Sequence, residues 1–509
     1  MTRTGRVLAI MVLGAALAFR LWWAIALPCD APGDTVLYER FAVNLLQHDV
    51  YSGEEGPPYS PSYIRTPGYP LFLAGVYSIF GVGNDVAVRA SQAVLDTSTC
   101  LLVALLALSW CPLGWDQRRK GRAFFAALIL AAACPMVALY VGTVLSETLT
   151  LFFGTACILA ASYALKAEGR RAAAWWAACG VLGGMATMVR PDSGLLLSAA
   201  GGAMGLRALA SAWTKRRQPG IARGELRAAV FQGAVLSLAF AATLAPWTIR
   251  NAKLFDTFMP LSPEHAQMPG EFVPYGYLAW VKSWISDQRY IESFLWEIDT
   301  QPLRIAELPA SACDSPQERE RVAALFALVN PPCTGASAAA AKPNGNDDAK
   351  ETEEPSAGAT ITPAADAEFM ALARERARRH PFRTHIILPA KRAVAMWFDT
   401  HSAYTPFDGE LFPLASLDWE SLQPLWLLLF MALVWLHTIL GGLGVWKLWR
   451  ETESRVWVLL IVLLIVPRVA FFATIENPEP RYLVELFPFT SAASGVALAW
   501  ILSRRASGN

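Results

Sequence analysis

The feature that most constrains this sequence is a series of apolar blocks, each about 20 residues long. An α-helix of that length can cross the hydrocarbon core of a bilayer, which is roughly 30 Å thick. Only 17% of the 509 residues are charged, which is too few to keep the surface of a soluble protein of this size hydrated. The sequence therefore predicts an all-α polytopic membrane protein.

We expect about ten transmembrane helices. The predicted spans are Val7–Leu27, Val86–Trp110, Ala123–Val141, Leu145–Leu165, Ala172–Met188, Gly194–Ala210, Ala228–Trp247, Leu425–Trp446, Val456–Ile475 and Leu483–Ser503. Lys and Arg cluster in the loops, and threading the chain back and forth puts every cluster on one side of the bilayer. The positive-inside rule makes that side the cytoplasm. We expect a multi-pass protein of the bacterial inner membrane whose other face meets the periplasm or exterior.

The first span has an alternative reading as a signal peptide. Arg3 and Arg6 precede an apolar run that reaches Ala24-Ile25-Ala26, a sequence that resembles a cleavage site. The run is long for a signal core, so we expect the span to be retained. Cleavage would leave the rest of the topology unchanged.

The spans divide the chain into three parts. Residues 1–250 form an N-terminal bundle with a first outer loop at 28–85, residues 251–424 form a large outer loop, and residues 425–509 carry the last spans. Within the first loop, the periodicity that follows Asp34 predicts a helix on the membrane surface. Tyr69–Phe80 is apolar but too short to span, so it is expected to be interfacial or re-entrant.

The large outer loop has two predicted features besides its helices. Residues 334–366 are rich in Ala, Pro, Gly and acidic residues, which predicts disorder. Cys313 and Cys333 show no CxxC spacing, so a disulfide is expected on an oxidising face and a metal site is not. Ala367–Arg379 and Ile386–Phe398 are predicted as helices that cover the site or lie along the interface.

Charged residues gather at the outer ends of the predicted helices. They are Asp30, Asp34, Arg65, Glu147, Arg190, Asp192, Arg250 and the run Glu476–Arg481. Charges at this depth are costly, so each is a functional candidate. A carboxylate that takes a proton from a hydroxyl, beside guanidiniums that hold a phosphate leaving group, would suit this set. Arg89, Asp96 and Arg468 lie within spans and are expected to be paired inside the bundle.

The order of these residues resembles one enzyme group. The first loop carries Asp34-x-x-x-Tyr38 and then Arg65-Thr-Pro-Gly-Tyr69-Pro, and later matches are Ser146-Glu147, Arg190-Pro191, Pro246-Trp247-x-x-Arg250-Asn251 and Arg481-Tyr482. This set resembles the polyprenyl-phosphate-sugar glycosyltransferases of the GT-C fold, which include protein O-mannosyltransferases and the lipid A aminoarabinose transferase. The resemblance runs from the first span to the last, with residues 251–424 unmatched.

The resemblance implies a role for each matching residue. Asp34 matches the first-loop acid that acts as general base on the acceptor hydroxyl, with Asp30 as the reserve. Arg65, Arg190 and Arg481 match basic positions that bind the donor phosphate. The substrate-binding candidates are Asp30, Tyr38, Tyr69, Glu147, Arg250 and Tyr482. Thr35 stands where many relatives have a second acid, so a divalent metal is not supported and no cofactor is expected.

The simpler alternatives remain open at this point. Asp34 could cap the surface helix, because Gly33-Asp34 is a typical helix start. Arg65, Arg190 and Arg250 could extend to lipid headgroups, and Tyr69 could be an interfacial anchor.

The expected function is inverting transfer of a sugar from a polyprenyl-phosphate donor to a hydroxyl of a glycan, lipid or protein on the outer side. The alternatives are a lipid-linked sugar transporter, or an inactive relative that serves as a subunit of an envelope assembly complex. A net charge of +1 argues against a nucleic-acid partner.

Overall fold

A computed structural model of the protein describes residues 2–29, 33–268, 270–286, 288–331, 358–400, 404, 417, 419 and 421–507. Over these residues the chain is helical and contains no β-strand. It divides into two compact units. The first comprises residues 1–271, 402–468 and 481–509, and the second comprises residues 272–401 and 469–480. The expected boundaries were 250 and 424, whereas residues 251–271 pack with the first unit.

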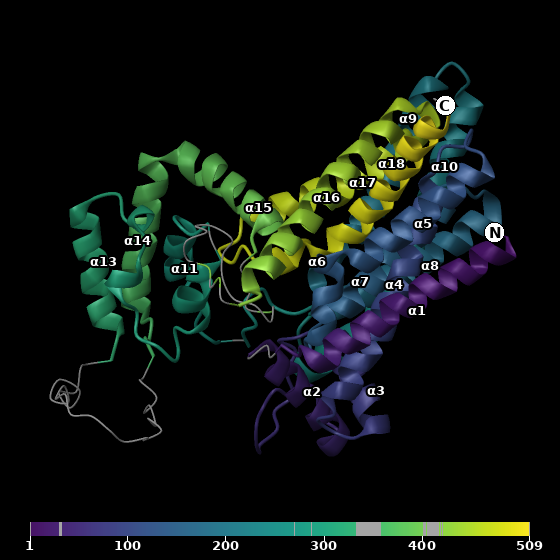
Figure 1. The fold of residues 1–509 in the computed structure, drawn as a ribbon. Helices are drawn as coiled ribbons and strands as arrows, with labels where there is room; N and C mark the ends of the chain where they lie inside the picture. The colour runs from purple at the N-terminus through teal and green to yellow at the C-terminus, as the bar shows by residue number, and fades with distance from the viewer. Residues whose placement is uncertain are drawn as a thin grey trace. The chain divides into compact units, whose positions relative to one another are not determined.

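The first unit is a bundle of long apolar helices (Figure 1). Its helices are α1 (Arg3–Ala26), α2 (Asp34–His48), α3 (Gly68–Phe80), α4 (Asp85–Trp110), α5 (Gln117–Ala133), α6 (Pro135–Ala138), α7 (Glu147–Ala164), α8 (Gly169–Val189), α9 (Gly194–Thr214), α10 (Pro219–Phe255), α16 (Gln423–Arg450) and α18 (Phe487–Ser507). The 3₁₀ turns η1 (Leu139–Gly142), η2 (Pro191–Ser193) and η9 (Pro480–Leu486) connect some of them. α17 (Arg455–Ala473) begins in this unit.

Nine helices in the described part of the chain are long and apolar enough to cross a membrane, or ten if one bent pair counts as a single span. This confirms the predicted multi-pass, all-α fold. Every predicted span coincides with a helix or with the bent pair. The protein is therefore an integral membrane protein.

Close packing between spans depends on small residues, because lipid offers no hydrophobic gain for helix association. α7 packs on α8 and α4, while α16 and α18 pack on one another. At Gly444 of α16, a Cβ atom would lie 2.0 Å from the carbonyl oxygen of Ala493 in α18. Only glycine allows the two backbones to approach this closely.

The span predicted at Ala123–Val141 is broken by a proline. α5 ends at Ala133, and the pair formed by α6 and η1 continues after a bend of 58°. Cys134 is extended because the ring of Pro135 disfavours the helical conformation in the residue before it.

The two short helices of the first outer loop lie at the same end of the bundle, away from the beginning of α1 and the end of α18 (Figure 1). α2 and α3 pack on each other. α2 buries Tyr38, Phe41 and Ala42, so these side chains face the protein. α3 has a fully buried Tyr69 and an exposed Ile79. Both helices occur where the sequence predicted them.

The second unit is a small helical domain with an aromatic core. It contains α11 (Tyr275–Lys282), α12 (Arg289–Ile291), α13 (Pro316–Val329), α14 (Pro363–Arg379) and α15 (Leu388–Phe398), with π-helical turns η3 (Glu292–Trp296) and η6 (Arg383–Ile387) and 3₁₀ turns η4 (Ile305–Glu307) and η5 (Ala310–Ala312). Phe369 of α14 packs against Tyr277 and Trp280 of α11. Arg376 of α14 is paired with Glu318 of α13 at 2.6 Å. The helix predicted at Ala367–Arg379, either covering the site or lying along the interface, is a core element of this domain, since Phe369, Leu372 and Ala373 are buried within it.

The predicted disordered segment, 334–366, ends too late. Helix α14 begins at Pro363, because Thr362 caps it with its hydroxyl and Ala365 and Phe369 bury apolar surface. The part between 332 and 357 lies outside the described residues. Cys333 also lies outside them, so the Cys313–Cys333 disulfide stays a prediction.

The intramembrane charges are paired in a way that the sequence only partly indicated. Asp96 is paired, as expected, but with Arg20 of α1, which also donates to the carbonyl oxygen of Ala132 at 3.2 Å and to Cys100 Sγ at 3.3 Å. Arg89 has a buried Nε for which the described residues supply no acceptor. The pair that forms is thus between spans and not along α4.

Candidate functional site

Charged residues from the first and last parts of the chain meet around Asp34. One carboxylate oxygen of Asp34 lies 3.1 Å from Nη2 of Arg65, and the other lies 3.1 Å from Nη1 of Arg481. Arg65 precedes α3, and Arg481 is in η9, directly before the last span. The side chain of Asp34 remains 21% exposed. Two arginines therefore hold one accessible carboxylate at the end of the bundle.

Asp34 is not a helix cap. The N-cap residue of α2 is Gly33, and Asp34 is the first helical residue. Both of its oxygens are directed to the arginines, and its charge also suits the positive end of the helix. Burial would raise the pKa of Asp34, but Arg481 and Arg65 outweigh burial and lower it to about 2. Asp34 is thus firmly ionised.

Arg65 is positioned by a close contact between two helices. A Cβ atom on Gly68, at the start of α3, would lie 2.5 Å from the carbonyl oxygen of Met188 at the end of α8. The hydroxyl of Thr66 donates to the carbonyl oxygen of Val189 at 3.5 Å. The Arg-Thr-Pro-Gly segment before α3 therefore packs against the end of α8. Arg190 directly follows α8, so the same contact holds both arginines in place.

A second charged cluster surrounds Arg190. Its guanidinium lies 2.5 Å from Glu147, 3.3 Å from Asp192 and 3.9 Å from Glu485. Arg468 of α17 is fully buried, pairs with Asp192, and lies 2.9 Å from Glu485. This confirms the expectation that Arg468 is paired within the bundle. One oxygen of Glu147 is bonded to Arg190, while its other oxygen is buried without a partner among the described residues.

Aromatic side chains join the two clusters. The guanidinium carbons of Arg190 and Arg481 both lie 5.5 Å from the ring centre of Tyr482, and Arg481 also lies 4.8 Å from that of Tyr404. Such contacts fix a guanidinium plane while leaving its N–H groups for other acceptors.

Tyr38 and Tyr69 lie beside this region but have different roles in the structure. Their rings meet edge to face at 5.1 Å. Burial and the nearby Asp34 raise the pKa of Tyr38 to about 12. Tyr69 is fully buried, and its hydroxyl donates to Gln92 at 2.9 Å. Neither an interfacial anchor nor a direct substrate contact fits that position of Tyr69, which instead supports Tyr38.

Arg250 is not brought to the site. Its guanidinium donates to the carbonyl oxygen of Ser62 at 2.7 Å and lies 4.9 Å from the ring of Trp247. These contacts hold the end of α10 against the first outer loop. Arg250 therefore has a structural role that does not require a bound substrate. Asp30 lies outside the described residues.

The residues near Asp34 do not fit a metal ion. Both oxygens of Asp34 already face guanidiniums, and the hydroxyl of Thr35 donates to the carbonyl oxygen of Val144 at 3.0 Å. A cation there would meet two positive charges. No group of three metal-binding side chains occurs among the residues that the structure describes.

Sequence reasoning missed two contributors. Glu485 lies within the predicted last span, where an isolated acid in an apolar run was a usable signal. Tyr404 lies in a stretch of sequence without periodicity or a motif, and no pattern in the sequence pointed to it.

The fold and the site together define a polytopic membrane protein with a carboxylate–arginine centre at one end of its spans. Residues 64–247 match the family described as dolichyl-phosphate-mannose-protein mannosyltransferase. Over that stretch, the match confirms the resemblance to polyprenyl-phosphate-sugar glycosyltransferases that the motifs indicated. It includes Arg65, Glu147 and Arg190, while Asp34 and Arg481 lie beyond its ends.

The solved structures that align with this chain have low sequence identity to it. The oligosaccharyltransferase AglB of Archaeoglobus fulgidus, in complex with an inhibitory peptide and a dolichol-phosphate, is 12% identical with a TM-score of 0.49, over 99% of this chain and 51% of its own. ArnT of Cupriavidus metallidurans, bound to undecaprenyl phosphate, is 15% identical with a TM-score of 0.38, over 99% of this chain and 79% of its own. The chain thus spans about half the length of AglB. No curated protein sequence matches it.

Proposed function

We propose that the protein is an inverting glycosyltransferase that takes a sugar from a polyprenyl-phosphate donor. The acceptor is a hydroxyl of a glycan, lipid or protein on the outer side of a bacterial inner membrane. The observation that carries this proposal is the accessible carboxylate of Asp34 held between Arg65 and Arg481, each at 3.1 Å. The family match over residues 64–247 supports a lipid-phosphate donor.

The chemistry divides between the carboxylate and the arginines. Asp34 takes the proton of the acceptor hydroxyl as its oxygen forms a bond to the anomeric carbon. The bond from that carbon to the phosphate oxygen breaks on the opposite face, and polyprenyl phosphate leaves as an anion. The guanidiniums of Arg65 and Arg481 stabilise this anion, so a general acid is not needed.

Donor binding would also strengthen the base. An aspartate with a pKa of about 2 is a weak proton acceptor, and Arg481 and Arg65 keep the pKa that low. When the donor phosphate draws the arginines to itself, Asp34 loses part of their stabilisation and its pKa rises. The carboxylate would become an effective base only when the leaving group is in place.

Arg190 is proposed as a further contact to the donor phosphate. Its guanidinium contacts the ring of Tyr482, as that of Arg481 does. It is, however, largely neutralised by Glu147 and Asp192, at 2.5 and 3.3 Å, so its contribution should be smaller than that of Arg65 or Arg481. Tyr38 and Glu147, at the margin of the site, are proposed to contact the sugar or the acceptor.

We propose that the reaction proceeds without a resident metal, because the arginines occupy both oxygens of Asp34. Transfer by the purified protein should then survive treatment with EDTA. Loss of transfer with EDTA, and recovery on adding a divalent cation, would contradict this.

The test uses purified protein in detergent, with a polyprenyl-phosphate sugar and a panel of acceptors. A transferase releases free polyprenyl phosphate, whereas a transporter has no measurable reaction where no membrane separates compartments. Arg65→Ala should reduce release roughly tenfold to a hundredfold, because one charge-assisted hydrogen bond is worth about 1.5–3 kcal/mol. Arg65→Lys should retain part of the activity, since it keeps the charge but loses the two-pronged geometry. No release from folded protein with any donor would favour the transporter or the inactive subunit.

A further inference from the structure

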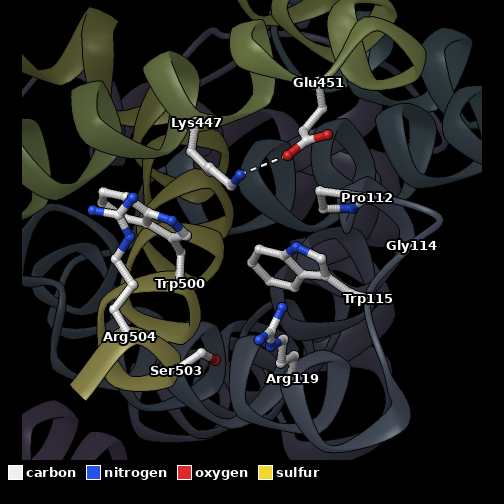
Figure 2. A pocket seen from close by; sticks show the side chains of 9 residues that line it. All are labelled: Pro112, Gly114, Trp115, Arg119, Lys447, Glu451, Trp500, Ser503 and Arg504. Atoms are coloured by element: carbon white, nitrogen blue, oxygen red, sulfur yellow. Dashed lines mark hydrogen bonds and ion pairs between the residues drawn. The ribbon is translucent and has the colours of Figure 1, made fainter. Parts of the chain in front are cut away.

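A pocket of about 390 Å³ lies at the opposite end of the bundle from Asp34. It is lined by Pro112, Gly114, Trp115, Arg119, Lys447, Glu451, Trp500, Ser503 and Arg504 (Figure 2). These residues come from the α4–α5 loop, the start of α5, the end of α16 and the last turns of α18. Its size falls within the range of about 300–1,000 Å³ that is usual for sites of small organic ligands.

The pocket is positively charged. Arg119, Lys447 and Arg504 face it with a single carboxylate, Glu451, so the lining carries a net charge of two positive. Glu451 lies 2.6 Å from Lys447, as the dashed line in Figure 2 marks. The exposed guanidinium of Arg119 has no hydrogen-bond acceptor among the described side chains. The positive charge is therefore only partly neutralised by the protein.

Aromatic rings give the pocket a rigid frame. Trp115 is nearly fully buried, and Trp500 meets Trp446 edge to face at 5.5 Å. The guanidinium of Arg504 lies 4.7 Å from the ring centre of Trp500. Tryptophans with nearby cations are typical of the level at which lipid headgroups lie, and basic pockets between helices on the cytoplasmic side are suited to anionic headgroups.

We propose that this pocket binds a phosphate ester, the chemistry shared by an anionic phospholipid headgroup and a soluble phosphate. Arg119 and Lys447 supply charged donors to the phosphate oxygens, and the tryptophans flank the glycerol backbone. The proposal is independent of the transferase function, because the pocket contains none of the residues of the Asp34 centre.

The experiment measures binding to the purified full-length protein by native mass spectrometry and by thermal stabilisation. The probes are palmitoyl-oleoyl phosphatidylglycerol, the matching phosphatidylcholine, and sn-glycerol 3-phosphate. The pocket variant is the double substitution Arg119→Gln with Lys447→Gln. Its control is Arg118→Gln with Arg450→Gln, which removes two positive charges from the same helix ends outside the lining. Thermal unfolding without ligand verifies that both variants are folded.

The wild-type protein should bind phosphatidylglycerol in preference to phosphatidylcholine. The affinity for phosphatidylglycerol should fall about tenfold in the pocket variant and stay near the wild-type value in the control variant. That result establishes a lipid site. Equal binding of glycerol 3-phosphate, lost in the same variant, establishes the phosphate site with a soluble source. Equal weakening in both variants, or no binding of any probe to wild type, overturns the proposal, because general surface charge would then explain the cations. The single variant Arg119→Gln, at an exposed position, repeats the comparison if the double variant does not fold.

Discussion

Asp34 is the residue on which the proposed chemistry depends. Asp34→Asn keeps its size but removes the proton acceptor, so transfer should fall at least about a hundredfold. The matched control is Asp49→Asn at the end of the same helix, where Asp49 has a φ of 55° that asparagine also tolerates. Activity is measured as release of polyprenyl phosphate, with size-exclusion elution as a check of folding. Near-normal turnover by the Asp34→Asn variant would transfer the role of base to Asp30.

The contact between Arg481 and Asp34 can be tested by pH without any substrate. The pKa of Asp34 is lowered from 3.8 to about 2, so this contact stabilises the fold above about pH 4 and loses its effect as the pH falls toward 2. Arg481→Gln lacks the part of this stabilisation that Arg481 supplies, while the part from Arg65 remains. The difference in Tm between wild type and variant should therefore narrow from pH 6 to pH 3. A difference that does not change with pH would mean that Arg481 stabilises the fold through its stacking on Tyr404 and Tyr482 instead.

Among the elements, the contact of α3 with α8 sets the position of Arg65. Gly68→Ala would place a Cβ atom 2.5 Å from the carbonyl oxygen of Met188, so the two helices must separate. We expect a loss of about 1–3 kcal/mol in stability and, because catalytic groups tolerate little displacement, a large fall in kcat/KM. Gly75→Ala in the same helix is the control, since a Cβ atom there meets nothing within 4 Å. Thermal unfolding and the transfer assay should separate the two variants; similar values for both would show that the contact is not needed.

The helices were largely predictable from the sequence, whereas the contacts between side chains of different helices were not. Apolar runs of span length identify a helix by themselves, and Pro135 marks the break after α5. By contrast, Arg481 and Asp34 are 447 residues apart, and no local pattern encodes which ends of a bundle adjoin. The same holds for Asp96, which pairs with Arg20 across two helices. The family resemblance named Asp34, Arg65 and Arg481, which the structure brings together, while their roles in binding and catalysis stay predictions. Arg250 lies apart from them, and its guanidinium packs on the rings of Trp247 and Phe255.

At the level of the whole molecule, one hydrogen bond near Asp34 decides whether the bent pair of α5 with α6 and η1 crosses the membrane. α5 alone would be about 26 Å long, shorter than the hydrocarbon core, and α6 with η1 adds the remainder. The hydroxyl of Thr35, in α2, bonds to the carbonyl oxygen of Val144, which follows η1. Since α2 lies between α1 and α4, this bond places both segments at the same end of the bundle. The bent pair therefore crosses the membrane, which gives ten spans among the residues that the structure describes.

Ten crossings put the start of α1 and the end of α18 on one side and the Asp34 centre on the other. We propose that the first side is cytoplasmic, because the Lys and Arg clusters of the sequence fall on that side. A green fluorescent protein fused after Ser507 should therefore fluoresce in bacterial cells, and alkaline phosphatase fused there should be inactive. Alkaline phosphatase inserted after Glu55, an exposed residue of the first outer loop, should be active because that enzyme needs an oxidising compartment to form its disulfides. Active phosphatase at both positions would mean nine crossings. Active phosphatase after Ser507 with inactive phosphatase after Glu55 would put Asp34 in the cytoplasm, where a nucleotide sugar becomes the natural donor.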